Sequence, residues 1–171
     1  MNNTFGMQIV PENDTDRLES LKRYKILGTT PEKQFDQLAM MIAKVFNVPI
    51  ALIAFVDENE VFFKANIGMG NVRNVDRGVS ICSLAILQSE PTIFTNPIDE
   101  PCLLQNPLVH GEFGLRFYAG VPLVSADGFN IGSVCIIDKK QRFFNNDQID
   151  LLKDFSVHII SLLELRLKTL V

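Results

Sequence analysis

Motifs that would assign this chain to a common catalytic class are absent from its sequence. There is no G-x-x-x-x-G-K-[ST] phosphate loop, no G-x-G-x-x-G fingerprint, no H-E-x-x-H zinc motif and no G-x-S-x-G nucleophile elbow. Gly68-Met69-Gly70 lacks the third glycine and the following helix of a dinucleotide site, so a turn is the simpler interpretation. We therefore predict no catalytic residues and no enzymatic activity.

Histidine and cysteine are scarce, with two and three residues respectively. Neither histidine has a cysteine or histidine partner at metal-ligand spacing, so no metal site is predicted. The cysteines, Cys82, Cys102 and Cys135, are odd in number and form no C-x-x-C pair. This usage is typical of a reducing cytoplasm rather than of a disulfide framework, and it predicts a cytoplasmic location.

Long basic runs and long apolar runs are lacking as well. The formal net charge is −4, and acidic and basic residues are interspersed, so nucleic acid is not expected as a partner. The longest apolar run, Val48–Val56, is far short of the roughly 20 residues that span a bilayer. The first six residues lack the basic and apolar regions of a signal peptide. No membrane association is expected.

What remains is the composition of one globular domain. The chain has 171 residues, of which 47% are hydrophobic and 21% charged, values that allow a single substantial core. Residues 1–14 are polar and carry no periodic signal, which predicts a flexible lead-in. Residues 15–171 are predicted to form the domain.

Three segments have helical signals. A first helix is expected over Asp16–Ile26, ended by Gly28. Thr30-Pro31-Glu32 has the features of a helix start, because Thr30 can cap and proline suits the first helical position. A last helix is expected to begin at Asn145 or Asn146 and to continue to Val171.

Five segments have strand signals, with a short helix expected at Ile81–Gln88. The strands are predicted at Val48–Val56, Glu60–Ile67, Thr92–Thr95, Arg116–Val124 and Asn130–Asp138. Links of a few residues join the first pair and the last pair, so each pair should be an antiparallel hairpin. Residues 68–80 and 96–115 are predicted loops, and the second is long enough to suggest function. The fold class is α+β, with a three-layer α/β/α-like arrangement.

Several stretches, in order along residues 15–170, resemble GAF domains of bacterial signalling proteins. They are Arg17 to Leu27, Thr30-Pro31-Glu32 with Phe35-Asp36, Val48 to Ile53 with Val56-Asp57, Phe63-Lys64 with Gly68, Asn106 to Val109, Arg116 to Leu123, Gly132 to Asp138, and the closing helix.

The resemblance implies an antiparallel sheet of five or six strands. It implies terminal helices on one face and a pocket on the other, under the short helix and the long loop. Such domains bind varied small molecules, including cyclic nucleotides, tetrapyrroles and metabolites, or bind nothing and relay dimer geometry, so the cofactor is unknown. Related sequences often read Phe-Cys-x-His where this chain has Ile81-Cys82-Ser83-Leu84, which disfavours a tetrapyrrole photosensor.

Seven residues are candidates for ligand contact. Four are expected near the pocket, and three lie in the short helix or the long loop: Phe62, Lys64, Arg116 and Tyr118, then Cys82, Cys102 and His110. Arg116 can pair with an anionic group and Tyr118 can stack or donate a hydrogen bond. The alternatives are that Arg116 binds loop carboxylates, that Tyr118 packs in the core and that Cys82 is a plain buried cysteine. Cys135 is expected to be a buried strand residue.

Three functions compete. The first is a sensory domain for an unidentified small molecule. The second is a relay or purely structural dimerisation module, because the last helix has more apolar surface than one face can bury. It predicts a homodimer through the N- and C-terminal helices and an output in a separate signalling protein. The third is a cysteine-dependent free methionine sulfoxide reductase, for which Cys82 and Cys102 are the plausible pair. The first two together are the favoured interpretation.

Overall fold

A six-stranded antiparallel sheet organises the chain, whose computed structural model describes residues 1–170. The strand order is β3-β2-β1-β6-β5-β4. Their bounds are β1 Ile50–Val56, β2 Glu60–Ile67, β3 Asn74–Asp76, β4 Thr92–Phe94, β5 Phe117–Val124 and β6 Asn130–Asp138. Five of the six strands agree with the predicted segments to within two residues, and both expected hairpins are present.

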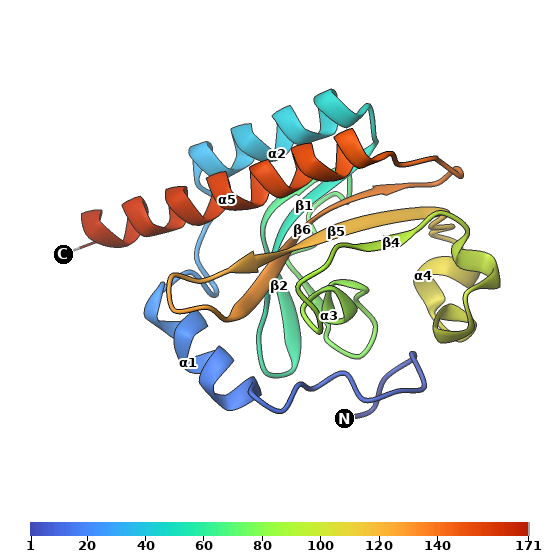
Figure 1. Cartoon of the computed structure of the whole chain (residues 1–171), viewed down its shortest axis with the longest axis horizontal. Helices are drawn as coiled ribbons and strands as arrows, with labels where there is room; N and C mark the ends of the chain where they lie inside the picture. Colours follow the sequence, from blue (N-terminus) through green and yellow to red (C-terminus); the bar gives the residue numbers. More distant parts are fainter. Residues whose placement is uncertain (171) are drawn as a thin grey trace.

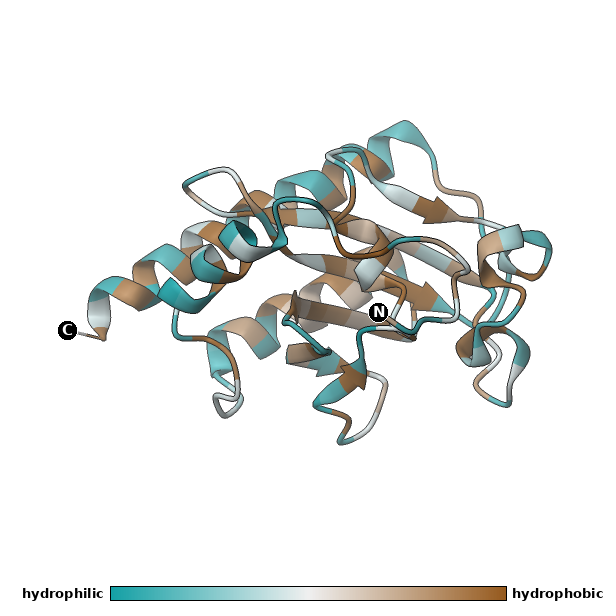
Figure 2. Ribbon diagram, turned by 90° about the horizontal axis from the view of Figure 1, so that it is seen from below, coloured by the Kyte–Doolittle hydropathy of each residue, from teal (hydrophilic) through white to brown (hydrophobic). Residues whose placement is uncertain are grey.

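The central strand β1 explains why the sheet carries a layer on each side. All of its seven residues are buried, and it pairs with β2 on one side and β6 on the other. Its continuous apolar sequence lacks alternation because both faces are covered. The hydropathy colouring in Figure 2 shows the same pattern, with hydrophobic strands at the centre and hydrophilic turns around them.

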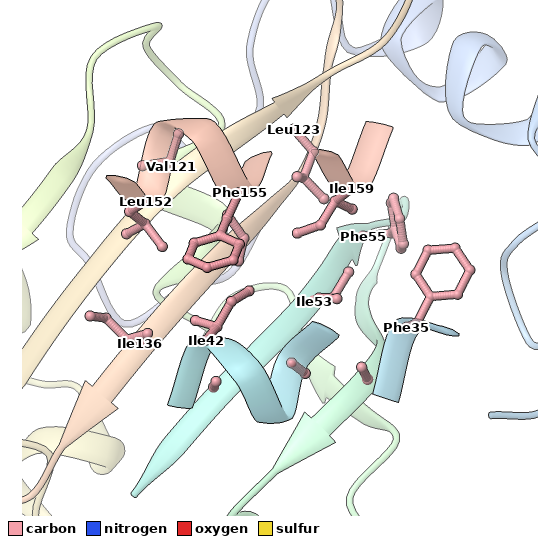
Figure 3. Close-up of a cluster of buried hydrophobic side chains, with 14 of the residues drawn as sticks. Phe35, Ile42, Ile53, Phe55, Val121, Leu123, Ile136, Leu152, Phe155 and Ile159 are labelled. Atoms are coloured by element: carbon pink, nitrogen blue, oxygen red, sulfur yellow. The ribbon is translucent and has the colours of Figure 1, made fainter. Parts of the chain in front are cut away.

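Two long helices cover one face of the sheet (Figure 1). They are α2, Lys33–Phe46, and α5, Asn146–Thr169. Figure 3 shows the core between them and the sheet, where Ile42 of α2 lies beside Phe155 of α5 and Phe35 of α2 lies beside Phe55 of β1. Asn145 begins α5 with a capping box, in which its side chain accepts from the Gln148 backbone and the Gln148 side chain accepts in return.

Short elements form the layer on the opposite face. These are α3 (Cys82–Ala85), α4 (Pro107–His110), and two 3-10 turns at Pro97–Asp99 and Pro101–Leu103. Buried Asn106 ties the layer together: its amide donates to Thr4 Oγ1 at 3.0 Å and to the Val79 carbonyl at 2.8 Å. The predicted loop 96–115 is therefore an ordered cover built of single turns.

The N-terminal residues, which the sequence predicts to be a flexible lead-in, contact the α3 side of the sheet. Phe5 is 4% exposed and Ile9 fully buried, and both belong to the apolar cluster on the α3 side of the sheet. The Thr4 amide also donates to the Gly78 carbonyl at 2.9 Å. Phe5 and Ile9 therefore attach this segment to the sheet, and Val10 packs against the same cluster. The segment lies below the sheet in Figure 1, on the side viewed in Figure 2.

Helix boundaries differ from prediction where tertiary contacts intervene. Helix α1 spans Asp14–Arg23, and α2 begins at Lys33 with Glu32 as its N-cap, three residues after Thr30. The Thr30 carbonyl instead accepts from Lys64 Nζ, which holds the Thr-Pro segment outside the helix. The short helix α3 has four residues rather than eight. Val171, which the sequence analysis includes in the last helix, lies outside the described residues.

Strand β3 is a further difference, because it lies inside a predicted loop. Three residues pair with the start of β2 at the sheet edge, and a run this short has no pattern to detect. Within residues 1–170, none of the helices combines the length and the apolar character that crossing a bilayer demands.

Candidate functional site

A small cavity lies between the sheet and the α3 layer. Its volume is about 20 Å³, which is room for roughly one water molecule. Side chains from five strands, α3, α4 and the loops beside these helices line it. The lining residues are Leu52, Phe63, Met69, Val75, Ser80, Ile81, Cys82, Leu108, Phe113, Leu115, Tyr118 and Ile137. The site predicted under the short helix and the long loop therefore exists, but side chains nearly fill it.

Two thiols and a phenol meet at the floor of this cavity. Cys82 Sγ lies 3.8 Å from Cys135 Sγ, and Tyr118 Oη donates to Cys82 Sγ at 3.6 Å. Gly120 makes the arrangement possible, because a Cβ at that position would lie 2.5 Å from Tyr118 Oη. The tyrosine ring thus lies along the sheet over a glycine, and its hydroxyl reaches the sulfur of α3.

Burial and mutual hydrogen bonding perturb this cluster. The bond with Cys135 lowers the pKa of Cys82 to about 7, against the opposing effect of burial. The same bond, followed by burial, raises the pKa of Cys135 well above its ordinary value. Burial, with the neighbouring thiols, raises the pKa of Tyr118. The sulfur pair can therefore share one proton, with thiolate character at Cys82.

Cys82 and Tyr118 are the two predicted site residues that line the cavity. Phe62 and Lys64 do not, and their expected placement near the pocket is wrong. Phe62 packs in the cluster under α2 and α5, and it is Phe63 that faces the cavity. The run Val61-Phe62-Phe63 is apolar on both faces, so the sequence gives no sign of which phenylalanine points where.

Lys64 is directed to the helix layer by an irregularity in the sheet. Ile53 pairs with Ala65 and the next residue of β1 with Phe63, so Lys64 has no partner in β1. Its side chain is fully buried, and Nζ donates to Glu32 Oε2 at 2.6 Å, to the Thr30 carbonyl at 2.6 Å and to Thr29 Oγ1 at 2.8 Å. The lysine charge is used in an internal ion pair on the opposite face from the cavity.

The other three predicted residues lie in or beside the cover. Arg116 Nη1 donates to the carbonyls of Val109 and Leu115, at 2.7 and 2.9 Å, so it holds the loop through carbonyls rather than carboxylates. His110 is exposed at the end of α4. Cys102 is half-buried in the second 3-10 turn, where burial raises its pKa. The sulfur beside Cys82 belongs to Cys135, not to Cys102.

Cys135 was predicted only as a buried strand residue, without a role at the site. The burial is confirmed, but its neighbours follow from register: Cys135 pairs with Gly120 of β5 and Leu52 of β1, which places it on the cavity side beside the Tyr118 ring. Across residues 1–170 there is no group of three or more cysteine, histidine or acidic side chains that could hold a metal ion.

A second hollow lies on the outer side of the helix layer. It is an open groove of about 460 Å³ between α2 and α5, lined by uncharged residues: Gln34, Gln37, Leu38, Met41, His158, Ser161, Leu162 and Leu165. Apolar side chains along it are well exposed, with Met41 at 53% and Leu165 at 60%. Exposed apolar side chains lining a groove commonly mark an interaction surface.

Comparison with known proteins identifies relatives of this arrangement. A family model described as the GAF domain matches residues 30–161. A cyclic di-GMP phosphodiesterase of Pseudomonas aeruginosa is 34% identical over 132 residues, which cover 77% of this chain and 22% of that protein. The chain therefore spans about 22% of the length of this curated relative.

Solved structures agree in fold at low identity. The GAF domain of an Acinetobacter phosphoenolpyruvate-protein phosphotransferase has a TM-score of 0.59 at 16% identity, covering 90% of this chain and 94% of that one. A free methionine-R-sulfoxide reductase from Neisseria meningitidis has a TM-score of 0.66 at 14% identity, covering 91% and 92%. At such identities the likeness concerns the fold alone.

Proposed function

This chain belongs to the GAF domain family, and we propose that it is a regulatory domain of bacterial signal transduction. It relays a signal through a homodimer of helices α2 and α5, and it has no catalytic activity of its own. The output lies in another domain or protein. The phosphodiesterase relative supports this, because the matched segment makes up only 22% of its length.

The observation that carries this proposal is the uncharged groove between α2 and α5. Its lining contains leucine, methionine, glutamine, serine and histidine but no lysine, arginine or carboxylate. A surface without charge offers nothing to select a charged partner, and it can pack against its own copy without like-charge repulsion. A two-fold contact would place the two α5 helices beside each other.

A chain of contacts connects the cavity to the output helix. Phe63 lines the cavity, and the next residue, Lys64, lies on the helix side and donates to Glu32 Oε2. The same oxygen accepts from Arg166 Nε of α5 at 2.8 Å. Arg166 Nη1 also donates to the carbonyls of Tyr24 and Lys25. A displacement of β2 at the cavity is thereby transmitted to the last two turns of α5.

Sedimentation velocity tests the dimer. We expect a dimer at tens of micromolar and a monomer for Leu165→Glu, which places a charge in the groove. The matched control is Phe143→Glu, because Phe143 is 98% exposed in the loop before α5 and away from the groove. The control should remain dimeric. A wild-type monomer at these concentrations, or equal behaviour of the two variants, would contradict the relay through α2 and α5.

A small-molecule input at the cavity is the second part of the proposal. Ser80, Cys82 and Tyr118 provide polar atoms in an otherwise apolar lining, which is the usual character of a ligand site. The present volume of about 20 Å³ admits no metabolite, so ligand entry must displace the covering loops.

Thermal unfolding against cyclic nucleotides, haem, bilins, nucleotides and amino acids tests the input. A ligand at a hundred times its dissociation constant adds about 2.7 kcal/mol, which raises the midpoint by roughly 5–11 °C for a chain of this size. If no compound shifts the midpoint while the protein is dimeric, the cavity is packing and the domain is a structural relay.

Support for a non-enzymatic role comes from the positions of the thiols. The reductase hypothesis relies on Cys82 and Cys102, yet the sulfur adjacent to Cys82 is that of a strand residue, Cys135. Turnover of free methionine sulfoxide by the purified protein with a thiol reductant would overturn this part of the proposal, and Cys102→Ser and Cys135→Ser would show which thiol takes part.

A further inference from the structure

We propose that Cys82 and Cys135 form an oxidisable thiol pair, which a hydroperoxide entering the cavity converts to a disulfide. This site shares Cys82 with the proposed ligand cavity, and it uses no residue of the groove proposed as the dimer interface. It uses two residues that the relay does not involve.

The geometry of the two sulfurs supports the bond. They lie 3.8 Å apart, both in the cluster between the sheet and α3. A disulfide requires about 2.05 Å, so they must approach by roughly 1.8 Å. Cys82 begins a helix of four residues, and Cys135 lies in the middle of β6. The short helix is the element free to move, because the strand is held by pairing on both sides.

The neighbouring groups favour reaction at Cys82. Tyr118 Oη donates to its sulfur, and the bond with Cys135 lowers its pKa, so Cys82 is the thiol with thiolate character. Cys82 also lines the cavity, whereas Cys135 lies behind it. Cys82 is therefore the thiol that attacks the oxidant, and Cys135 is the resolving thiol that attacks the oxidised Cys82.

The steps balance without a further reagent. The Cys82 thiolate attacks one oxygen of the hydroperoxide, the O–O bond breaks, and Cys82 becomes a sulfenic acid while the leaving oxygen takes a proton and departs as water or an alcohol. The Cys135 thiol then attacks the Cys82 sulfur, the S–S bond forms, and the sulfenic oxygen leaves as water with the thiol proton. Two thiols are oxidised and one peroxide is reduced.

Access to the buried pair is through the cover of the cavity. Met69, Leu108 and Phe113 line its outer side and are each only half-buried, so the lining reaches the protein surface. Hydrogen peroxide is little larger than the one water that the cavity admits. A metabolite-sized oxidant is excluded by the same dimensions.

The experiment uses the full chain carrying Cys102→Ser, which leaves the two paired thiols. Hydrogen peroxide should consume both thiols, lower the mass by two hydrogen atoms and yield a linked Cys82–Cys135 peptide, all reversed by dithiothreitol. With Cys135→Ser added, dimedone supplied while the peroxide-treated protein is unfolded in urea should trap a sulfenic acid on Cys82. Tyr118→Phe should slow the reaction about tenfold, because hydrogen bonds to charged groups are among the stronger ones.

Two results would overturn the proposal. One is that both thiols survive peroxide in the folded protein under conditions that oxidise the urea-unfolded chain completely. The other is a disulfide in the wild-type chain that maps to Cys102. The wild-type peptide map decides the question even if a variant fails to fold. A monomeric wild type would refute the relay and leave the thiol result unaffected.

Discussion

Replacing Glu32 by glutamine should destabilise the domain more than any ordinary surface substitution. One carboxylate oxygen, Oε2, accepts from Lys64 Nζ at 2.6 Å and from Arg166 Nε at 2.8 Å. The lysine side chain is fully buried, that of Arg166 is 11% exposed and that of Glu32 is 32% exposed. The substitution keeps the shape of the side chain but leaves two cations facing a neutral amide.

The size of the effect lies between two limits. An exposed ion pair contributes about 0–1 kcal/mol, and breaking a fully buried pair costs about 3–5 kcal/mol. Because Glu32 is about one-third exposed, water screens part of the loss, and Lys64 keeps its bonds to Thr29 Oγ1 and the Thr30 carbonyl. We expect a loss of about 2 kcal/mol, which lowers the unfolding midpoint by roughly 4–8 °C at this chain length.

The pH dependence gives an independent check. Burial alone would raise the pKa of Glu32, but the hydrogen bonds from Lys64 and Arg166 outweigh it and lower the pKa below 4.5. A carboxyl whose pKa is lower in the folded than in the unfolded state stabilises the fold at pH values above the unfolded-state pKa. This stabilisation is lost as the pH falls through the folded-state pKa. The difference in the free energy of unfolding between wild type and Glu32→Gln should be largest at pH 7 and should decrease below pH 4.5.

Urea unfolding at pH 7 and at pH 3.5 measures both quantities. Glu19→Gln is the matched control, because Glu19 is exposed on α1 and makes no ion pair within the described residues; it should change stability by less than about 0.5 kcal/mol. A loss below 0.5 kcal/mol for Glu32→Gln at pH 7, or a loss of equal size at both pH values, would refute this account of the cluster.

Two further predictions concern local structure. Ile9→Ala should lower the free energy of unfolding by about 2–4 kcal/mol, because Ile9 is fully buried under the sheet; a change under 0.5 kcal/mol would restore the flexible lead-in. Asn145→Ala removes the capping box of α5 and should cost about 1 kcal/mol in urea unfolding, whereas Asn71→Ala, an exposed loop residue, should cost almost nothing.

Local sequence signals were sufficient to predict five of the six strands and the two long helices. Strand β1 is apolar throughout because both of its faces are covered, and the short links to β2 and between β5 and β6 allow only antiparallel pairing. The start of α5 was predicted at Asn145 or Asn146 from local features, and the structure has Asn145 as the N-cap. These signals are local, so they can be read without knowledge of distant contacts.

Tertiary structure decided the direction of side chains in segments buried on both faces. Phe62 and Phe63 are chemically identical neighbours, and only the register with β1 sends the second to the cavity. The irregularity that turns Lys64 toward Glu32 has no sequence signature, because it depends on the strand opposite.

The location of the site could be predicted from the sequence, but the residues that form it could not. Cys82 and Tyr118 lie where the resemblance implied a pocket, but Cys135 joins them only through its pairing with Gly120, fifteen residues earlier and on another strand. Proximity between distant residues is a property of packing, and so is the volume that remains between them. A sequence can state that a segment is apolar, but only the assembled layers determine whether a ligand, a single water or a second thiol occupies the space.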